Sequence, residues 1–131
     1  MKKNELKKSL NRFAQAVKRL EEGVVKGHND LEKDGVIQRF EFTFELLWKC
    51  LMIFLENKGV VCKTPKDCLK QAFRIGLIED DKVYLRMLED RNMMSHLYSR
   101  EESREVFDRV KGIHLPVMRA LAARLKKEGD E

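Results

Sequence analysis

The 131-residue sequence contains only two prolines, seven glycines and three cysteines, and it has no low-complexity tract or Pro/Gly-rich linker. Because few residues interrupt the chain, we find no basis for a domain boundary and expect a single domain over residues 1–131. The cysteines are odd in number, and Cys50, Cys62 and Cys68 lack the C-x-x-C spacing of a zinc or redox site. They are therefore predicted to be reduced thiols, with Cys50 in the core and no bound metal.

Long apolar runs are also missing. No run approaches membrane-spanning length, and Lys7, Lys8 and Arg12 interrupt the only segment that begins like a signal peptide. We therefore expect a cytoplasmic protein that does not associate with a membrane. The sequence has no Gly-rich phosphate loop, no H-E-x-x-H motif and no nucleophile elbow. This argues against nucleotide triphosphate binding by this chain alone, and we expect no cofactor.

Charge is abundant and slightly unbalanced. The chain has 27 Lys and Arg against 22 Asp and Glu, a net charge of +5, and charged residues make up 37% of it. The excess of positive charge favours an anionic partner such as RNA, although many basic proteins bind none. The high charge together with 43% hydrophobic residues is typical of a compact, helix-rich protein.

Apolar residues recur every three or four positions, and no alternation of period two is long enough for a sheet. We expect helices over residues 4–26, 29–59, 64–76, 80–91 and 99–125, with a kink at Pro116 in the last. The predicted fold class is all-α, an up-and-down four-helix bundle with a short additional helix.

The second of these helices is apolar over most of its circumference. One face carries Phe40, Phe44 and Leu47, and the apolar surface extends further through four more residues, namely Phe42, Leu46, Cys50 and Ile53. Such a helix has to be covered on more than one side. Either several helices of the same chain cover it, as in the core of a bundle, or a second subunit does.

The candidate functional residues cluster just after the fourth predicted helix. Arg91, Asn92, His96 and Tyr98 lie within eight residues. Arginine presents a permanently charged fork of donors suited to phosphate, histidine exchanges protons near neutral pH, and tyrosine offers a hydroxyl acceptor. This set of side chains is suited to phosphodiester chemistry.

In an unbroken helix Arg91 and His96 would point about 140° apart. They converge on one phosphate only if the helix ends between them, or if a two-fold axis brings a second copy opposite. A structural interpretation is equally open at this point. Arg91 could be a surface ion-pair partner of Asp90 and its acidic neighbours, and His96 a hydrogen-bonded connector residue.

Residues 35–49, 71–78 and 87–96 resemble the nucleotidyltransferase substrate-binding protein family, a branch of the HEPN superfamily. The resemblance extends from about residue 5 to residue 125. In that superfamily an arginine, a polar residue and a histidine four to six positions later mark metal-independent ribonucleases, and Arg91, Asn92 and His96 match this signature. The histidine-x-tyrosine extension found in toxin–antitoxin pairs matches His96, Leu97 and Tyr98.

The resemblance implies a HEPN-like homodimer that cleaves RNA at a composite cleft and has a small nucleotidyltransferase as partner. Arg91 would stabilise charge on the scissile phosphate, His96 would act as acid or base, and Asn92 would orient the pair. The partner would adenylylate Tyr98 and so silence a toxin. The alternative is a non-catalytic substrate-binding subunit of a two-component nucleotidyltransferase.

Overall fold

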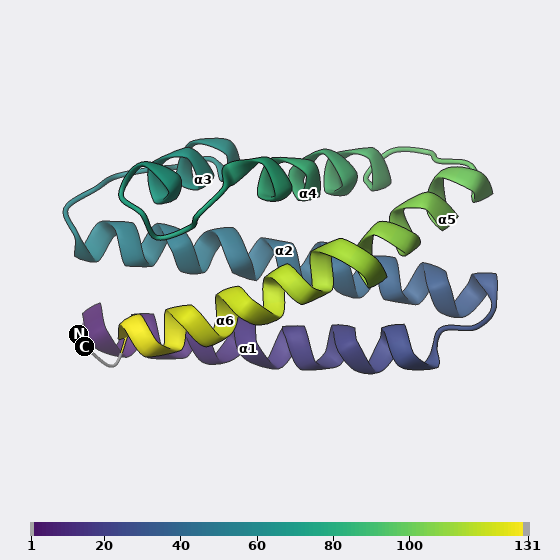
Figure 1. Ribbon diagram of the computed structural model, residues 1–131, viewed down its shortest axis with the longest axis horizontal. Helices are drawn as coiled ribbons and strands as arrows, with labels where there is room; N and C mark the ends of the chain where they lie inside the picture. The colour runs from purple at the N-terminus through teal and green to yellow at the C-terminus, as the bar shows by residue number, and fades with distance from the viewer. Residues whose placement is uncertain (1, 130–131) are drawn as a thin grey trace.

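The computed structural model describes residues 2–129, and within this range it contains helices and no strands. Four long helical segments run up and down, and a short fifth helix lies in one connection (Figure 1). This confirms the predicted four-helix bundle. In chain order the elements are α1 (Lys2–Lys26), α2 (Asp30–Asn57), the short α3 (Pro65–Arg74), α4 (Asp81–Met94), and α5 (Arg100–Arg109), which continues through a π-helical turn η1 (Val110–His114) into α6 (Leu115–Gly129).

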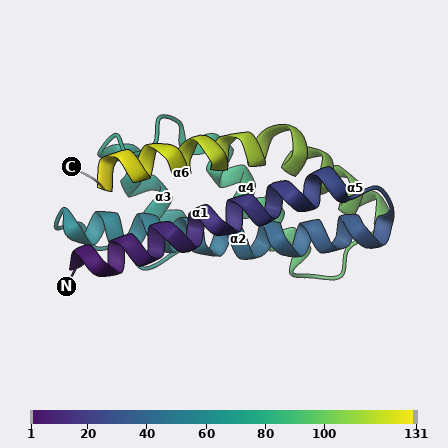
Figure 2. The same ribbon diagram turned by 90° about the horizontal axis from the view of Figure 1, so that it is seen from below.

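Helix α2 is the centre of the bundle. It contacts α1, α3, α4 and α5, and Figure 2 shows α1 lying beside both α2 and α6. The bundle itself covers most of the apolar surface of α2: Cys50 is fully buried, and Leu46 and Ile53 pack against the core. Two side chains remain outside, since Leu31 is 82% exposed and Phe42 is 60% exposed. Cover by a second subunit therefore remains a prediction for this part of α2.

The predicted helix starts are confirmed by their hydrogen bonds. Ser99 and Glu102 form a reciprocal capping box at the start of α5, and Thr64 accepts from the Asp67 N–H at the start of α3. Asp80 caps α4 through the Lys82 N–H. After α2, Gly59 has φ +80°, the left-handed conformation that glycine adopts without steric cost.

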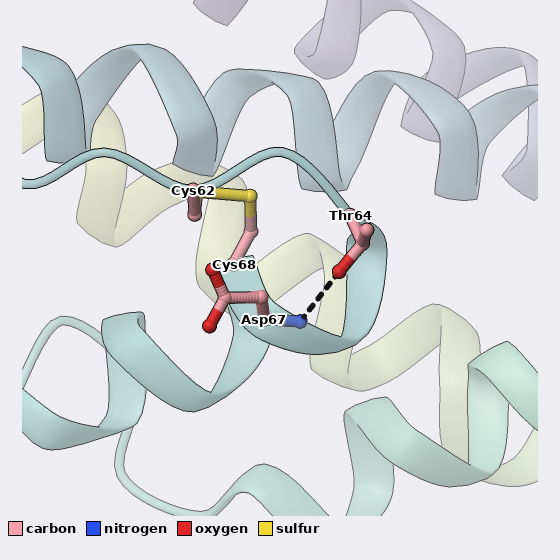
Figure 3. The surroundings of a disulfide bond; sticks show 4 residues. All are labelled: Cys62, Thr64, Asp67 and Cys68. Carbon is pink, nitrogen blue, oxygen red and sulfur yellow. Dashed lines mark hydrogen bonds between the residues drawn. A yellow bond between two sulfur atoms is a disulfide. The ribbon is translucent and has the colours of Figure 1, made fainter.

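The prediction of three reduced cysteines was wrong for two of them. Cys62, in the connection between α2 and α3, forms a disulfide with Cys68 in the first turn of α3 (Figure 3). Cys50 is a free, buried thiol. The chain turns at Thr64, where α3 begins, and this turn brings Cys62 and Cys68 together. The odd count indicated only that one cysteine had to remain unpaired, and six positions of separation match no common motif.

The predicted kink at Pro116 takes another form. The chain widens into η1 immediately before the proline, and the Leu115 N–H bonds to the Val110 carbonyl five residues back. Proline lacks a backbone donor, and its ring would clash with the carbonyl one α-helical turn earlier. A single wide turn accommodates both effects, and it places His114 in the interior.

Within residues 2–129, none of the helices combines the length and apolarity that crossing a membrane requires.

Candidate functional site

The candidate residues lie at the C-terminal end of α4 and in the loop that follows it. Arg91 and Asn92 are in the last turn, α4 ends at Met94, and Ser95 is its C-cap. His96 is exposed after the cap, and Tyr98 is partly buried just before α5 begins. The helix therefore ends between Arg91 and His96, which removes the 140° separation that a continuous helix would impose. In the described part of the chain, no hydrogen bond or ion pair joins these two side chains.

Arg91 is held against α2. Its Nη2 donates to Glu45 Oε2 at 2.7 Å, and its Nη1 donates to Asn92 Oδ1 at 3.1 Å. The guanidinium group has five N–H donors, so donors remain for an incoming phosphate after these two bonds. Asn92 therefore contacts the Arg91 guanidinium, and the role that the resemblance implies for it, orienting the pair or the phosphate, stays a prediction. The acidic partner of Arg91 is a residue of α2, not Asp90 or the other acidic neighbours in α4 that the surface ion-pair interpretation named.

Two glutamates of α2 lie near this guanidinium. Partial burial raises the pKa of Glu41, and the positive charge of Arg91 opposes the shift. Partial burial also acts to raise the pKa of Glu45, but Trp48, Arg91 and Lys49 outweigh it and the pKa falls. Glu45 is therefore ionised at neutral pH and neutralises part of the positive charge that Arg91 offers to a phosphate.

Tyr98 faces a shallow pocket of about 400 Å³ on α2. The pocket is lined by Leu31, Asp34, Gly35, Ile37, Gln38 and Glu41 in addition to Tyr98. Burial raises the pKa of the Tyr98 hydroxyl, and the nearby carboxylates of Asp34 and Glu41 raise it further. The hydroxyl is therefore protonated at neutral pH, and a group attached to it would extend beside the acidic face of α2.

A buried ionic cluster lies one residue before Arg91. Asp90 is bound by Arg109 through two hydrogen bonds, Nε to Oδ2 at 3.0 Å and Nη2 to Oδ1 at 2.8 Å. His114 Nε2 lies 2.7 Å from Asp90 Oδ2. Burial acts to raise the pKa of Asp90, but the hydrogen bonds from His114 and Arg109 prevail and lower it. Asp90 is thus an interior carboxylate, which rules out the alternative that it forms a surface ion pair with Arg91.

Sequence reasoning missed Glu45 and the cluster of Asp90, Arg109 and His114 as parts of this region. The sequence pattern indicates no partner for Glu45. His114 is fully buried, although it follows a charged stretch of the last helix. One signal was present: Asp90 falls three residues after Met87 and four before Met94, on the buried face of α4. A carboxylate on such a face requires a partner in the interior.

An antiparallel bundle that presents an arginine, an asparagine and a histidine around one helix end defines a helical protein of the HEPN class. Residues 2–127 match the family described as nucleotidyltransferase substrate binding protein like. The chain belongs to this family.

Solved structures share its fold. A protein of Thermus thermophilus superposes with a TM-score of 0.76 at 30% identity, over 91% of this chain and 99% of that one. HI0074 of Haemophilus influenzae superposes with a TM-score of 0.73 at 28% identity, over 89% and 98% of the two chains. Its structure is described as revealing the fold of a substrate binding domain of a nucleotidyltransferase.

Among curated proteins, the chain is similar to a probable ribonuclease HepT of Haemophilus influenzae. The two are 32% identical over 81 residues, which cover 58% of this chain and 56% of the relative. The matched part is thus little more than half of that protein.

Proposed function

We propose that this protein is the toxin of a toxin–antitoxin pair and acts as a metal-independent endoribonuclease. The main support is that α4 ends at Met94. Arg91 and Asn92 therefore lie in the last turn of the helix, and His96 is exposed on the loop that follows it. The similarity to a probable ribonuclease supports the same reaction.

In the proposed reaction, the RNA 2′-hydroxyl oxygen attacks the adjacent phosphorus and the bond to the 5′-oxygen breaks. The products are a 2′,3′-cyclic phosphate and a 5′-hydroxyl. Arg91 stabilises the negative charge that develops on the phosphate oxygens, and Asn92 holds the guanidinium in place. His96 transfers a proton, either from the attacking hydroxyl or to the leaving oxygen.

The reaction needs both a base and an acid, and the cluster of one chain contains one histidine. We therefore propose a homodimer in which two copies of His96 and Arg91 share one cleft. The exposed Leu31 and Phe42 support this assembly, because helix geometry places them on one face of α2 and Leu31 lines the Tyr98 pocket. We expect Phe42→Glu to convert the dimer to a monomer in light scattering. A dimer that survives both Phe42→Glu and Leu31→Glu would place the contact elsewhere.

We further propose that a small nucleotidyltransferase partner silences the protein by adenylylating Tyr98. The modification would add bulk and negative charge beside Asp34 and Glu41, where an RNA phosphate would meet additional repulsion. Incubation with the partner and ATP should raise the intact mass by one adenylyl group, and Tyr98→Phe should abolish the increase. An unchanged mass increase in Tyr98→Phe would assign the modification to another residue.

The central experiment is cleavage of purified RNA in the presence of a chelator. Wild type should cleave, and His96→Ala should not. His28→Ala is the matched control, because His28 is also a histidine outside the core but lies in the connection between α1 and α2. Loss of cleavage in chelator, or equal cleavage by His96→Ala, would contradict the proposal. The intact mass of each sample should be measured first, so that adenylylated protein is not assayed.

The second candidate function is a non-catalytic subunit that presents substrate to a nucleotidyltransferase. The ion pair between Arg91 and Glu45 favours it, since a carboxylate occupies one of the donors that a phosphate would use. The description of HI0074 points the same way. This candidate predicts a stable complex with the nucleotidyltransferase and no RNA cleavage by unmodified protein. Failure of the two proteins to co-purify would count against it.

A further inference from the structure

The position of Asp90 is unusual for an ionised side chain. It immediately precedes Arg91, its side chain is 2% exposed, and the groups that bind it come from α5 and η1. A third basic side chain, Arg86 of α4, approaches Asp90 Oδ1 with its Nε at 3.7 Å. A surface ion pair would need none of this burial. The arrangement joins the last turn of α4 to the segment that follows α5.

His114 connects the same cluster to α2. Its ring is fully buried and stacks on Phe40 with the ring centroids 5.3 Å apart. The π-helical turn directs this ring inward, and its Nε2 reaches Asp90. The last turn of α4 is therefore held from two directions. Arg91 binds Glu45 of α2, and Asp90 binds Arg109 and His114.

This cluster fixes the orientation of α4 more than it stabilises the fold. A buried ion pair contributes little net stability compared with a well-packed apolar substitute, because removing charges from water costs free energy. Its two parallel hydrogen bonds, however, are directional. Consecutive side chains of a helix point about 100° apart, so a rotation of α4 that displaced Arg91 would also break the bonds between Asp90 and Arg109.

We propose that Asp90, Arg109 and His114 form a positioning network that sets the orientation of Arg91. None of the three reaches the reacting atoms in this role. Asp90 acts through the backbone of α4, Arg109 fixes Asp90, and His114 fixes Asp90 against α2. The consequence for catalysis rests on the proposed ribonuclease function, whereas the consequence for the orientation of Arg91 does not.

The first test reads the orientation of Arg91 without any activity assay. The side-chain Nε–Hε signal of Arg91 is followed by NMR in wild type, in Asp90→Asn and in Thr43→Val. Thr43 is also buried and polar, but its hydroxyl donates to the carbonyls of Arg39 in α2 and Ala16 in α1, and not to α4. We expect the Arg91 signal to shift toward that of a free arginine in Asp90→Asn and to stay in place in Thr43→Val. An unchanged Arg91 signal in folded Asp90→Asn would overturn the proposal.

The second test separates positioning from general loss of structure. Asp90→Asn and Arg109→Gln should each lower kcat for RNA cleavage roughly tenfold or more, with KM changed less than about twofold, because the phosphate still binds but is poorly aligned. Arg109→Lys retains the positive charge and should recover part of the loss. If Asp90→Asn does not fold, Arg109→Gln and Arg109→Lys carry the test, with circular dichroism to confirm folding.

The outcomes of the two tests are distinguishable. If kcat falls as much in Thr43→Val as in Asp90→Asn, general destabilisation explains the loss of activity, and the positioning role is overturned. If wild type cleaves no RNA, the proposed function fails, and the NMR measurement alone then decides whether Asp90 orients Arg91.

Discussion

The two ends of α4 are held by different interactions. At its N-terminal end, the connection from α3 packs through the buried Leu77 and Ile78, and earlier in the chain a disulfide ties the segment before α3 to the first turn of α3 (Figure 3). At its C-terminal end, ionic groups form the contacts, with Arg91 on Glu45 and Asp90 on Arg109 and His114. Apolar packing is non-directional and tolerates small rotations, whereas directional hydrogen bonds do not. The end that carries the candidate functional residues is the end with directional contacts.

The largest expected effect is the loss of the buried carboxylate at the C-terminal end. Asp90→Asn leaves the partly buried Arg109 without its counter-charge, and we expect it to lower the free energy of unfolding by about 3 kcal/mol. Denaturation in urea measures this change. Asp30→Asn is the matched control, because Asp30 also binds two arginines, Arg100 and Arg104, but near the surface. A loss no greater than that of the control would contradict the account.

Removal of the disulfide is the contrasting change, because this bond precedes α4 in the chain and lies outside its C-terminal end. Cys62→Ser opens a short loop whose ends are six positions apart, and the loss of its constraint on the unfolded chain should cost about 2 kcal/mol. Urea denaturation of wild type with and without reductant gives an independent value, because Cys50 is unpaired under both conditions. We expect the Arg91 NMR signal to be unaffected in folded Cys62→Ser. A shift as large as that in Asp90→Asn would remove the distinction between the two ends.

Acidification sharpens the comparison, because a buried carboxylate holds the C-terminal end of α4. The pKa of Asp90 in the folded protein is below its ordinary value of 3.8. The stability that its ionised form contributes is therefore complete above pH 3.8 and is lost as pH falls through the folded-state pKa. We expect the difference in unfolding free energy between wild type and Asp90→Asn to be constant from about pH 5 to about pH 7 and to shrink below about pH 4. A difference that grows on acidification would have the wrong sign.

The smallest expected effect concerns RNA affinity. Glu45→Gln keeps a hydrogen-bond acceptor for Arg91 and removes one negative charge near the proposed phosphate position. We expect RNA to bind about 1 kcal/mol more tightly, roughly a fivefold lower Kd at low salt, and the gain to decrease as salt is added. Fluorescence anisotropy with a labelled RNA measures it, and Glu21→Gln is a control because Glu21 pairs with Arg119 on α1 and α6. Weaker binding by Glu45→Gln would assign Glu45 a role in holding Arg91 ready for phosphate.

The helices and their starts could be predicted because their signals are local. Apolar periodicity and the caps at Thr64, Asp80 and Ser99 depend on residues within a few positions of one another. The cluster around Asp90 could not be located in the same way, because its partner Arg109 lies 19 positions away. A carboxylate on an apolar face indicates that a buried partner exists, but only the packing of α4 against the segment after α5 identifies it.

The candidate site was predictable in part for the same reason. Arg91, Asn92, His96 and Tyr98 are close in sequence and form a recognisable motif. The expected helix over residues 80–91 ends before His96, as α4 does, although α4 continues to Met94. Glu45 lies 46 positions from Arg91, so its contact depends on the register between α2 and α4. The disulfide was not predicted, because the spacing of Cys62 and Cys68 matches no known motif. The turn at Thr64 brings the two cysteines together.

The central claim is that Arg91 and His96 act together in one cleavage site. A double-mutant cycle of kcat/KM for cleavage of a defined RNA in chelator tests it most directly, with wild type, Arg91→Ala, His96→Ala and the double variant. Each single change should lower kcat/KM roughly 100-fold. If the two residues act as a unit, kcat/KM of the double variant should be only slightly lower than that of the more impaired single variant. Losses that multiply in the double variant would show that the two side chains act independently and would contradict the account.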